Sequence, residues 1–313
     1  MPKNVKASKI KVVGIGGSGV NAVSRMAREG VFGVELIAVN TDAQSLRICP
    51  IAKKILIGKE ATAGLGTGMD IKLGEKAAKE SQGELKEILQ GAEMVFLTCG
   101  LGGGTGTSGI PVVAEIAKSI GALTLAVVTL PFSFEGAQRK ALAQAGLKKL
   151  EKKVDGLLVI SNDKLLELTE PNVTLEKAFW FCDTVLREAV KGIADLISLP
   201  GIINVDFADL RSVLESSGKA FLGIGRARGE KRALTAANAA LHSPLLNFSV
   251  KDSHGILLNI AGRDDLSLDE VNLAATFIKK TAKPGTKLIF GVSDDPSLAN
   301  GEIKITVIAT SRG

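Results

Sequence analysis

A run of glycine and hydroxyl residues at 101–109 (Leu-Gly-Gly-Gly-Thr-Gly-Thr-Ser-Gly) constrains the fold of this chain more than any other feature. It follows an apolar stretch at 94–98, which predicts a buried strand, and it precedes 110–119, which predicts a helix opening at Pro111. A strand that leads into a glycine-rich turn at a helix start presents free backbone N–H groups to an anion. The sequence therefore predicts a phosphate-binding loop. It is not a Walker A loop, because the chain contains no Gly-x-x-x-x-Gly-Lys-Ser/Thr pattern.

The first half of the chain alternates between strand and helix patterns. The predicted strands cover 9–14, 35–40, 94–98, 123–129 and 156–161, and the predicted helices cover 20–29, 69–90, 110–119 and 136–152. Such alternation indicates a parallel sheet with helices on both faces. Ligands of these sheets bind outside the carboxyl ends of the strands, which is where the glycine-rich loops fall.

The chain changes character after a long helix predicted at 175–197, which a Leu-Pro-Gly sequence ends. Beyond it, the patterns predict helices up to about 216, at 232–241 and at 268–282, and strands at 221–226, 256–261, 287–292 and 302–310. We expect the last two strands to pair with each other. This part of the chain predicts a smaller α+β domain, with the long helix as the connector.

Composition argues against several functions. The chain has 313 residues, 45% of them hydrophobic, which is enough for one large domain or two of ordinary size. It has no tyrosine and one tryptophan, and its basic residues are scattered, so we expect no nucleic-acid binding. The three cysteines form no zinc spacing, which fits a reduced cytosolic compartment. No signal peptide precedes the first strand and no apolar run reaches about 18 residues, so we expect no membrane span.

Two further glycine clusters flank the second predicted strand. Residues 14–19 satisfy Gly-x-Gly-x-x-Gly, the dinucleotide fingerprint, which is a weak signal alone, and Asp42 is a late candidate for its acidic partner. Residues 64–68 (Gly-Leu-Gly-Thr-Gly) form the other cluster. Three such loops in one α/β sheet predict a polyphosphate that is surrounded on several sides. The alternative is that the loops are only tight turns.

The segment 204–209 (Asn-Val-Asp-Phe-Ala-Asp) places two carboxylates three residues apart, on one face of a turn that enters a helix. An aspartate near a helix start is often only a cap. The functional interpretation is a pair that polarises and orients a water molecule.

These residues resemble the FtsZ branch of the tubulin/FtsZ GTPase superfamily. The family signature Gly-Gly-Gly-Thr-Gly-Thr-Gly matches 102–108 except at Ser108, and the family's synergy loop matches 204–209 fully. The segments 16–26, 40–44 and 131–136 also match, and the similarity runs in order from about residue 9 to 310.

The resemblance implies an α/β fold in which a Rossmann-like, parallel-sheet GTPase domain is joined by a long central helix to a smaller α+β domain. The expected boundaries are 1–174 for the GTP-binding domain, 175–198 for the central connecting helix, 199–216 for the synergy loop and following helix, and 217–313 for the C-terminal GTPase-activating domain.

The resemblance also implies a GTP or GDP site in the first domain. It assigns nucleotide binding to Gly16, Gly17, Ser18, Gly19, Asn21, Gly66, Gly102, Gly103, Gly104, Thr105, Gly106, Thr107, Pro131, Glu135, Arg139, Asn162, Phe179 and Asp183. Asn162 and Asp183 would read guanine, and Phe179 would pack on the base. A carboxylate can accept from guanine N1–H and the 2-amino group, a donor pair that adenine lacks.

Catalysis would fall to Asp206, Asp209 and Asn204, which the resemblance places too far from the nucleotide of their own subunit to act on it. They would instead reach the nucleotide of a neighbour in a head-to-tail protofilament, so hydrolysis would require assembly. Mg²⁺ is expected through phosphates and water, with K⁺ as a further candidate cation. The expected partners are further copies of the chain and division-ring proteins recruited through a tail absent here, in the cytoplasm at the division site, without nucleic acid or direct membrane insertion.

Some residues depart from the family pattern. In the loop that resembles the γ-phosphate loop, Thr67 and Met69 replace alanines, and Asp70 adds a carboxylate that would repel a γ-phosphate unless a metal intervenes. Ser108 fits only if its φ is negative. One alternative is therefore a relative that binds nucleotide but hydrolyses or assembles weakly. Another is a Rossmann dehydrogenase that uses 14–19.

Overall fold

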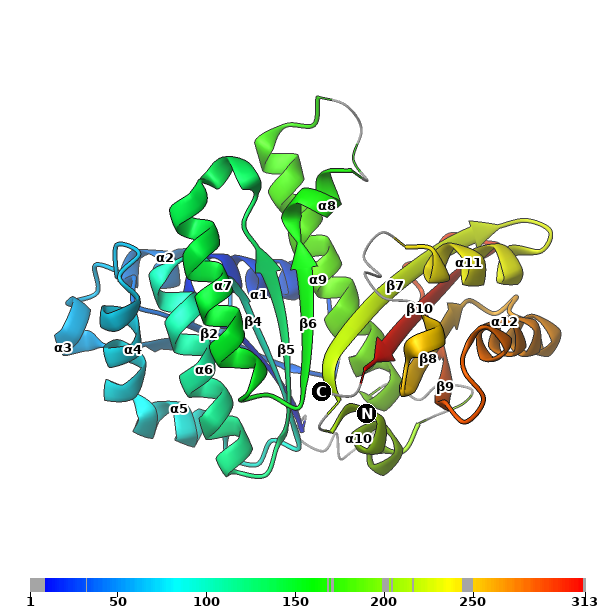
Figure 1. The fold of residues 1–313 in the computed structure, drawn as a ribbon, viewed down its shortest axis with the longest axis horizontal. Coiled ribbons are helices and arrows are strands. Elements are labelled where there is room, and N and C mark those ends of the chain that lie inside the picture. Colours follow the sequence, from blue (N-terminus) through cyan, green and yellow to red (C-terminus); the bar gives the residue numbers. More distant parts are fainter. Residues whose placement is uncertain are drawn as a thin grey trace. The chain divides into compact units, whose positions relative to one another are not determined.

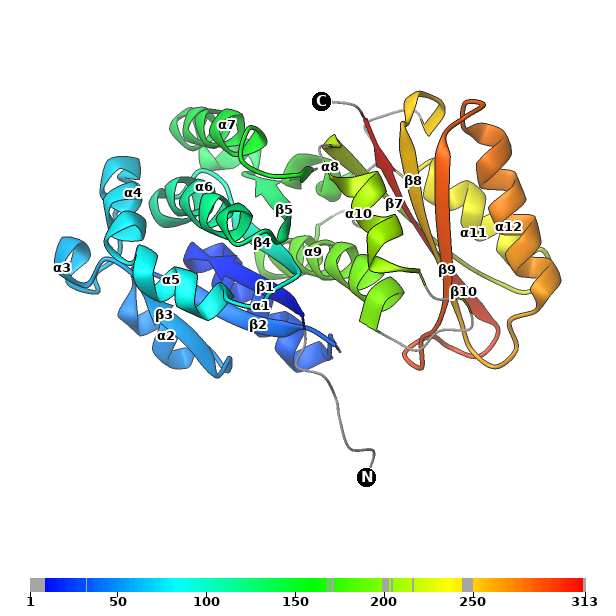
Figure 2. The same ribbon diagram turned by 90° about the horizontal axis from the view of Figure 1, so that it is seen from below.

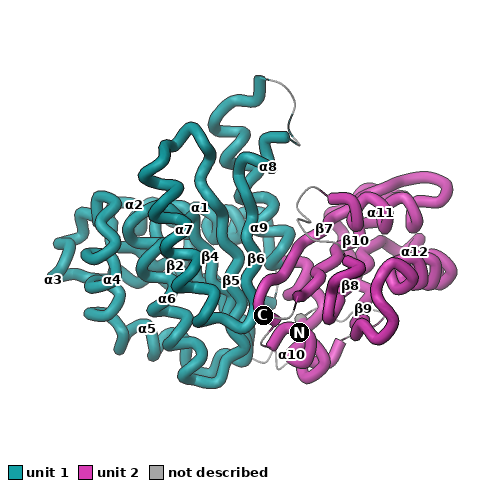
Figure 3. The backbone as a smooth tube through the Cα atoms, viewed as in Figure 1, with its two compact units in different colours: residues 1–190 teal, residues 191–313 magenta. Residues whose placement is uncertain are grey.

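The computed structural model describes residues 9–31, 33–167, 169, 172–198, 203, 205–215, 217–243 and 250–311. The chain forms two compact units, 1–190 and 191–313, shown in different colours in Figure 3. The boundary falls inside the long helix α9 (Leu175–Ser198), so each unit includes part of that helix.

Unit 1 is built on a parallel sheet with the strand order β3-β2-β1-β4-β5-β6. The central strand β4 is an apolar run that is buried from Met94 to Cys99, as a strand covered on both faces requires. The strands are β1 (Ile10–Ile15), β2 (Glu35–Asn40), β3 (Lys53–Leu56), β4 (Met94–Gly100), β5 (Leu123–Leu130) and β6 (Gly156–Ser161).

Helices cover both faces of this sheet, with α1 on one face and α6 and α7 on the other (Figures 1 and 2). The helices that lie wholly in unit 1 are α1 (Gly16–Glu29), α2 (Ala43–Ile48), α3 (Lys59–Thr62), α4 (Ile71–Glu80), α5 (Gln82–Leu89), α6 (Gly104–Ser119), α7 (Ala137–Glu151) and α8 (Asn162–Leu166), with a 3-10 turn, η1, at Ser133–Glu135. Apolar side chains from the strands and from α4 to α7 form one buried core.

Two helix predictions in this unit were wrong in detail. The helix predicted at 110–119 begins at Gly104 and holds Pro111 in its interior. The first N–H groups of a helix have no acceptor within it, so small residues can extend a helix backwards without losing hydrogen bonds. The helix predicted at 69–90 is divided into α4 and α5 at Ser81, whose Oγ accepts from Gly58 N at 3.1 Å.

Unit 2 has the strand order β7-β10-β8-β9, in which β10 pairs antiparallel with both β7 and β8. Its strands are β7 (Gly218–Arg228), β8 (Gly255–Gly262), β9 (Lys287–Asp294) and β10 (Glu302–Thr310). Its helices are α10 (Phe207–Leu214), α11 (Arg232–Leu241) and α12 (Leu268–Thr281), with a 3-10 turn, η2, at Val250–Asp252. The predicted pairing of the last two strands was wrong, because α12 is a crossover that sets β9 parallel to β8. The predicted class, a parallel α/β part followed by a smaller α+β part, is confirmed.

A buried group of four charges holds the C-terminal end of α9 within unit 2. Lys191 Nζ lies 2.8 Å from Asp195 and 3.0 Å from Asp295, and Lys304 Nζ lies 2.8 Å from the same Asp295 oxygen. Burial alone would raise the pKa of Asp295, but Lys304, Ser297 and Lys191 together hold it well below its usual value. The charges balance in pairs, which is how ionised groups persist in a protein interior.

Candidate functional site

Two helices of unit 1 begin side by side without a capping side chain. The N-cap residues of α1 and α6 are Ile15 and Gly103, and neither makes a side-chain hydrogen bond to its helix. Gly16 has a φ of +72°, and a Cβ there would lie 2.8 Å from Gly106 N, so only glycine permits this approach. The free N–H groups and the partial positive charge of both helix ends therefore meet at one place, which suits an anion.

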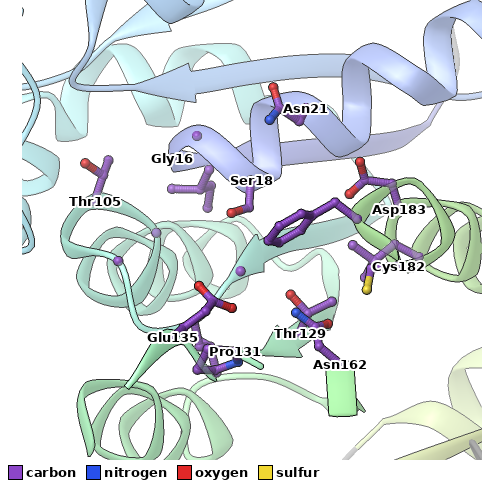
Figure 4. Close-up of a pocket in the computed structure, with 18 of the residues that line it drawn as sticks. Gly16, Ser18, Asn21, Thr105, Thr129, Pro131, Glu135, Asn162, Cys182 and Asp183 are labelled. Carbon is purple, nitrogen blue, oxygen red and sulfur yellow. The ribbon is translucent and has the colours of Figure 1, made fainter. Parts of the chain in front are cut away.

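A cavity of about 550 Å³ opens at these helix starts (Figure 4). All of its lining residues belong to unit 1. Most of the predicted nucleotide-binding residues line it, namely Gly16, Gly17, Ser18, Asn21, Gly103, Gly104, Thr105, Gly106, Pro131, Glu135, Arg139, Asn162, Phe179 and Asp183. The fold thus brings together residues that are spread over more than half of the chain.

The other four predicted residues, Gly19, Gly66, Gly102 and Thr107, shape the walls rather than line the cavity. Gly19 packs on β4, where a Cβ would lie 2.5 Å from Thr98 O. Gly66 N donates to the Thr41 carbonyl at 3.2 Å. Thr107 Oγ1 accepts from Gly102 N at 2.8 Å and so fixes the turn before α6.

Ser108 and Asp70, two departures from the family pattern, have structural roles. Ser108 is an ordinary helical residue of α6, and its Oγ donates to Gly104 O at 2.8 Å. The Asp70 carboxylate caps α4, accepting from Lys72 N at 2.8 Å and Leu73 N at 3.1 Å.

The end of the cavity away from Thr105 carries an amide side chain, Asn162, and a carboxylate side chain, Asp183 (Figure 4). Asn162, at the start of α8, is 4% exposed, and its Oδ1 has no hydrogen-bond partner. A buried acceptor of this kind calls for a donor, which a ligand in the cavity would supply. Phe179 of α9 contacts Phe132 edge to face, with 5.2 Å between the ring centroids.

Asp183 lies at the same end, on the first half of α9, and is paired with Arg25. Burial raises the pKa of the Asp183 carboxyl to about 6, and the Arg25 guanidinium opposes this shift. Arg25 was not predicted from the sequence as a residue of the site. The signal was its spacing of four residues from Asn21, which places both on one face of α1.

Other lining residues were also missed, namely Ile15, Thr67, Gly100, Leu101, Thr129, Glu176, Cys182 and Leu186. Cys182 lines the cavity as an unreactive thiol, because burial raises the pKa of that thiol to about 12. The Glu135 carboxylate is engaged, since one oxygen accepts from Phe132 N at 2.8 Å and the other pairs with Arg139.

The predicted catalytic aspartates belong to unit 2. Asp206 occupies the N-cap position of α10, but its side chain makes no cap hydrogen bond. Asp209, in the first turn, is 59% exposed and lies 3.7 Å from Lys287 Nζ. Neither residue lines the cavity. Asn204, the third predicted residue, lies outside the described residues.

A cavity with uncapped helix starts at one end and an amide and a carboxylate at the other defines a nucleotide-binding protein. Residues 9–170 match the model of the Tubulin/FtsZ family, GTPase domain, and residues 218–312 match that of the FtsZ family, C-terminal domain. The chain therefore belongs to the tubulin/FtsZ family and carries its GTPase domain, for which GTP and GDP are the ligands.

Solved structures agree with this assignment. A structure of FtsZ from M. jannaschii, an empty dimer, is 46% identical to this chain, with a TM-score of 0.94 over 99% of this chain and 89% of that one. A mutant of the same FtsZ gives 46% identity and a TM-score of 0.93, covering 97% and 91%. GDP-bound CetZ1 from Haloferax volcanii shares the fold, with 21% identity and a TM-score of 0.82 over 97% and 94%. In the described part of the chain, no helix has the length and apolar content needed to cross a membrane.

Proposed function

We propose that this chain hydrolyses GTP within head-to-tail filaments, and that each active site is shared between two subunits. The cavity of one subunit holds the nucleotide, and Asp206 and Asp209 of the next subunit act on it. The observation that carries this proposal is that the two parts belong to different units: Asp206 and Asp209, at the start of α10 in unit 2, are exposed and do not line the cavity of unit 1.

The binding roles follow from the chemistry of each end of the cavity. The N–H groups at the starts of α1 and α6 hold the phosphates, with the hydroxyls of Ser18 and Thr105 as further donors. Asp183 accepts from guanine N1–H and the 2-amino group, and Asn162 completes its hydrogen bonding on the same base. Phe179 packs on the base, while Glu135 and Arg139 lie on the ribose and phosphate side.

The donor set at the phosphate end consists of backbone N–H groups and hydroxyls. Mg²⁺ suits such a site when phosphate oxygens and water complete its coordination, and it would neutralise charge on the transferring phosphoryl group. K⁺ is a further candidate cation. Among the described residues there is no cluster of histidine, cysteine and carboxylate side chains that could hold a metal by itself.

Catalysis in this scheme is the orientation of the attacking water. The carboxylates that line the cavity are Glu135, Glu176 and Asp183, and Glu135 and Asp183 are engaged in ion pairs with Arg139 and Arg25. In the α10 pair, the Asp206 side chain makes no cap hydrogen bond that would have to break, and the Asp209 side chain is 59% exposed. A contact between unlike surfaces that does not close produces an open filament. The dimer seen for M. jannaschii FtsZ supports self-association.

The experiment is to measure GTPase rate and sedimentation together against protein concentration, with GTP and Mg²⁺. We expect both to rise from a shared threshold. A constant specific activity on dilution would contradict the shared site. Binding of GTP without a rise in either hydrolysis or sedimentation would favour the alternative, a relative that hydrolyses and assembles weakly. The observation that supports this alternative is the left-handed backbone of Met69 (φ +70°) beside the phosphate end of the cavity.

A complementation experiment tests the sharing directly. Asp209→Ala lacks the carboxylate but keeps the cavity, and Asp183→Ala keeps the carboxylate but loses the base contact. Each variant alone should be nearly inactive. A mixture should recover activity. Where an Asp183→Ala subunit meets an Asp209→Ala subunit in a mixed filament, the first can supply an intact Asp209 to the intact cavity of the second. Full inactivity of the mixture, with both variants present in the pellet, would contradict the proposal.

We further propose that the filaments form the division ring in the cytoplasm at the division site, with division-ring proteins as partners. The family assignment supports this role. A fluorescent fusion should form a band at the cell middle, and the Asp209→Ala variant should disturb division. The finer functional division into 1–174, 175–198, 199–216 and 217–313 stays a prediction. Deletion of 199–216 should abolish hydrolysis and leave GTP binding intact.

A further inference from the structure

A lysine of β9 lies beside one of the proposed catalytic carboxylates, within unit 2. Lys287 is the first residue of β9, and its Nζ lies 3.7 Å from Oδ1 of Asp209, in the first turn of α10. The two side chains are 50% and 59% exposed. An ion pair as open as this contributes little to stability. The pair is therefore accessible to a group that approaches unit 2 from outside.

Ser212 of α10 ties the Lys287 ammonium to the same turn of helix. Lys287 Nζ donates to Ser212 Oγ at 2.5 Å, and Ser212 Oγ donates in turn to the backbone oxygen of Asp209 at 2.5 Å. An ammonium has three N–H donors, of which Ser212 takes one, and the Asp209 carboxylate oxygen at 3.7 Å is beyond hydrogen-bond distance. These two residues thus fix the position of the ammonium and leave donors for a ligand.

The side chains that line the nucleotide cavity of unit 1 are more acidic than basic. In the described part of the chain, two arginines, three carboxylates and no lysine line it. Both arginines are already paired, Arg25 with Asp183 and Arg139 with Glu135. A triphosphate bound there keeps much of its negative charge, and it repels a carboxylate that is brought within a few ångströms. A cation that arrives together with Asp209 would offset that repulsion.

We infer that Lys287 is a further catalytic residue, which each subunit supplies together with Asp209 to the nucleotide of its neighbour, and that its ammonium donates a hydrogen bond to the terminal phosphate. This inference rests on the proposed function, which brings Asp209 to that phosphate, and a group 3.7 Å from Asp209 then arrives with it. Hydrolysis joins the water oxygen to the terminal phosphorus and breaks the bridging P–O bond. GDP keeps the bonding electron pair, and one proton of the water goes to solvent. Lys287 stays protonated throughout, and its charge stabilises the phosphoryl oxygens during the transfer.

The test measures GTP hydrolysis per sedimented subunit well above the assembly threshold, so that a change in assembly is not counted as a loss of catalysis. Lys287→Met removes the charge and should lower this rate about tenfold, while GTP binding below the threshold changes less than about twofold, because the cavity belongs to unit 1. Lys287→Arg keeps a cation and should retain most of the rate. Lys283→Met removes an exposed lysine paired with Asp252 in the same unit, and it should keep the wild-type rate. A wild-type rate in Lys287→Met, or the same loss in Lys287→Arg, would overturn the inference.

Mixed filaments test whether Lys287 acts from the same surface as Asp209. In a mixture of Lys287→Met and Asp183→Ala, the second variant can supply both intact groups to the intact cavity of the first, so the rate should exceed the sum of the separate rates. In a mixture of Lys287→Met and Asp209→Ala, no subunit carries both groups, and we expect no gain. A gain in the second mixture, or no gain in the first with both variants present in the pellet, would overturn the inference.

A failure of the proposed function would give a different result. If Asp209→Ala hydrolysed GTP as fast as the wild type, the shared site would be contradicted, and with it the role given to Lys287. If Asp209→Ala is inactive and Lys287→Met hydrolyses GTP normally, the shared site stands and only the role of Lys287 is overturned.

Discussion

Arg25 Nε donates a hydrogen bond to Asp183 Oδ2 at 3.2 Å, and Arg25 Nη2 lies 3.1 Å from the same oxygen in an ion pair. The second oxygen of the carboxylate is not used in this pair. The arginine therefore orients Asp183 and leaves it an acceptor site for a ligand. Arg25 in turn lies over the ring of Trp180, 6.0 Å from its centroid, which limits its freedom to turn away.

Changing Asp183 to asparagine should change the preferred base. Asparagine presents one acceptor and one donor, which suits the N1–H and the 2-oxo group of xanthine and not the two donors of guanine. We expect Asp183→Asn to bind GTP about 10- to 100-fold more weakly and to gain binding of xanthosine triphosphate. Competition binding measures both. Glu176→Gln changes another carboxylate of the cavity and should keep the guanine preference; a shift in that variant, or none in Asp183→Asn, would contradict the base-reading role.

Nucleotide binding and stability should respond to pH with opposite signs. The folded-state pKa of Asp183 is about 6, above its ordinary 3.8. Below pH 6 the carboxylate gains a proton and loses its acceptor role, so the affinity for GDP should fall about tenfold between pH 7 and pH 5. The raised pKa contributes stability that is present below 3.8 and lost as pH rises through about 6. Calorimetric titrations at each pH, with Asp183→Asn as the non-titrating control, should show the slope in the wild type alone.

Two glycine-to-alanine substitutions should have opposite effects on stability. At Gly74 in α4, a Cβ would lie 2.4 Å from Ser108 Oγ and 2.8 Å from Gly104 O, so Gly74→Ala should destabilise by about 2 kcal/mol and weaken GTP binding. At Gly83 in α5, a Cβ meets nothing within 4 Å, so Gly83→Ala should stabilise by about 0.5 kcal/mol. Urea unfolding measures both. Removing the Ser108 side chain should recover part of the first loss, and equal stabilities of the two variants would show that α4 does not press on α6.

Met69 has a left-handed backbone, with φ at +70°. This conformation costs a residue with a Cβ about 1 kcal/mol relative to glycine. Met69→Gly should therefore raise the free energy of unfolding by about 0.5–1 kcal/mol, whereas Met69→Ala keeps the Cβ and should bring no gain. A gain in both variants would show that the side chain, and not the backbone, was the source of strain.

The buried charges of unit 2 should be sensitive to the loss of one member. Lys304→Met leaves Asp295 with one lysine instead of two in a site where both residues are about 2% exposed, and it should cost about 3 kcal/mol. Lys283→Met removes an exposed pair with Asp252 at 3.0 Å and should change stability by less than about 1 kcal/mol. Thermal unfolding of the two variants makes the comparison. Similar small losses would mean that the buried network relaxes when one charge is removed.

Much of the fold could be predicted from local pattern. The strand β4 is an uninterrupted apolar run, and the glycine loops sit at strand ends, so the parallel sheet and the place of the cavity follow directly. The break at Ser81 could not be predicted, because it depends on a hydrogen bond with Gly58, which is distant in sequence. The start of α6 was placed too late because glycines lower helix propensity, whereas the close approach of Thr67 Oγ1 leaves no room for a Cβ at Gly104 and so requires glycine in the first turn of this helix.

The residues of the candidate site also divide into those that could be predicted from the sequence and those that could not. Residues within motifs, such as Gly16 and Thr105, were found by spacing, and the structure brings them to one cavity. Arg25 and Thr67 were missed as lining residues because their importance lies in partners from other segments, Asp183 and Thr105. The spacing of Arg25 from Asn21 places its side chain on one face of α1, but which residue it pairs with is set by tertiary packing.

The meeting of α1 and α6 at Gly16 and Gly106 has a consequence for the life of the protein in the cell. Two helix ends of the same partial sign repel each other, and an anion between them removes that repulsion. The bound nucleotide thus stabilises the folded state, and the free energy of unfolding of the chain rises with the nucleotide concentration. A fall in the guanine nucleotide pool would then shorten the lifetime of the chain through proteolysis, so that its abundance follows the metabolic state.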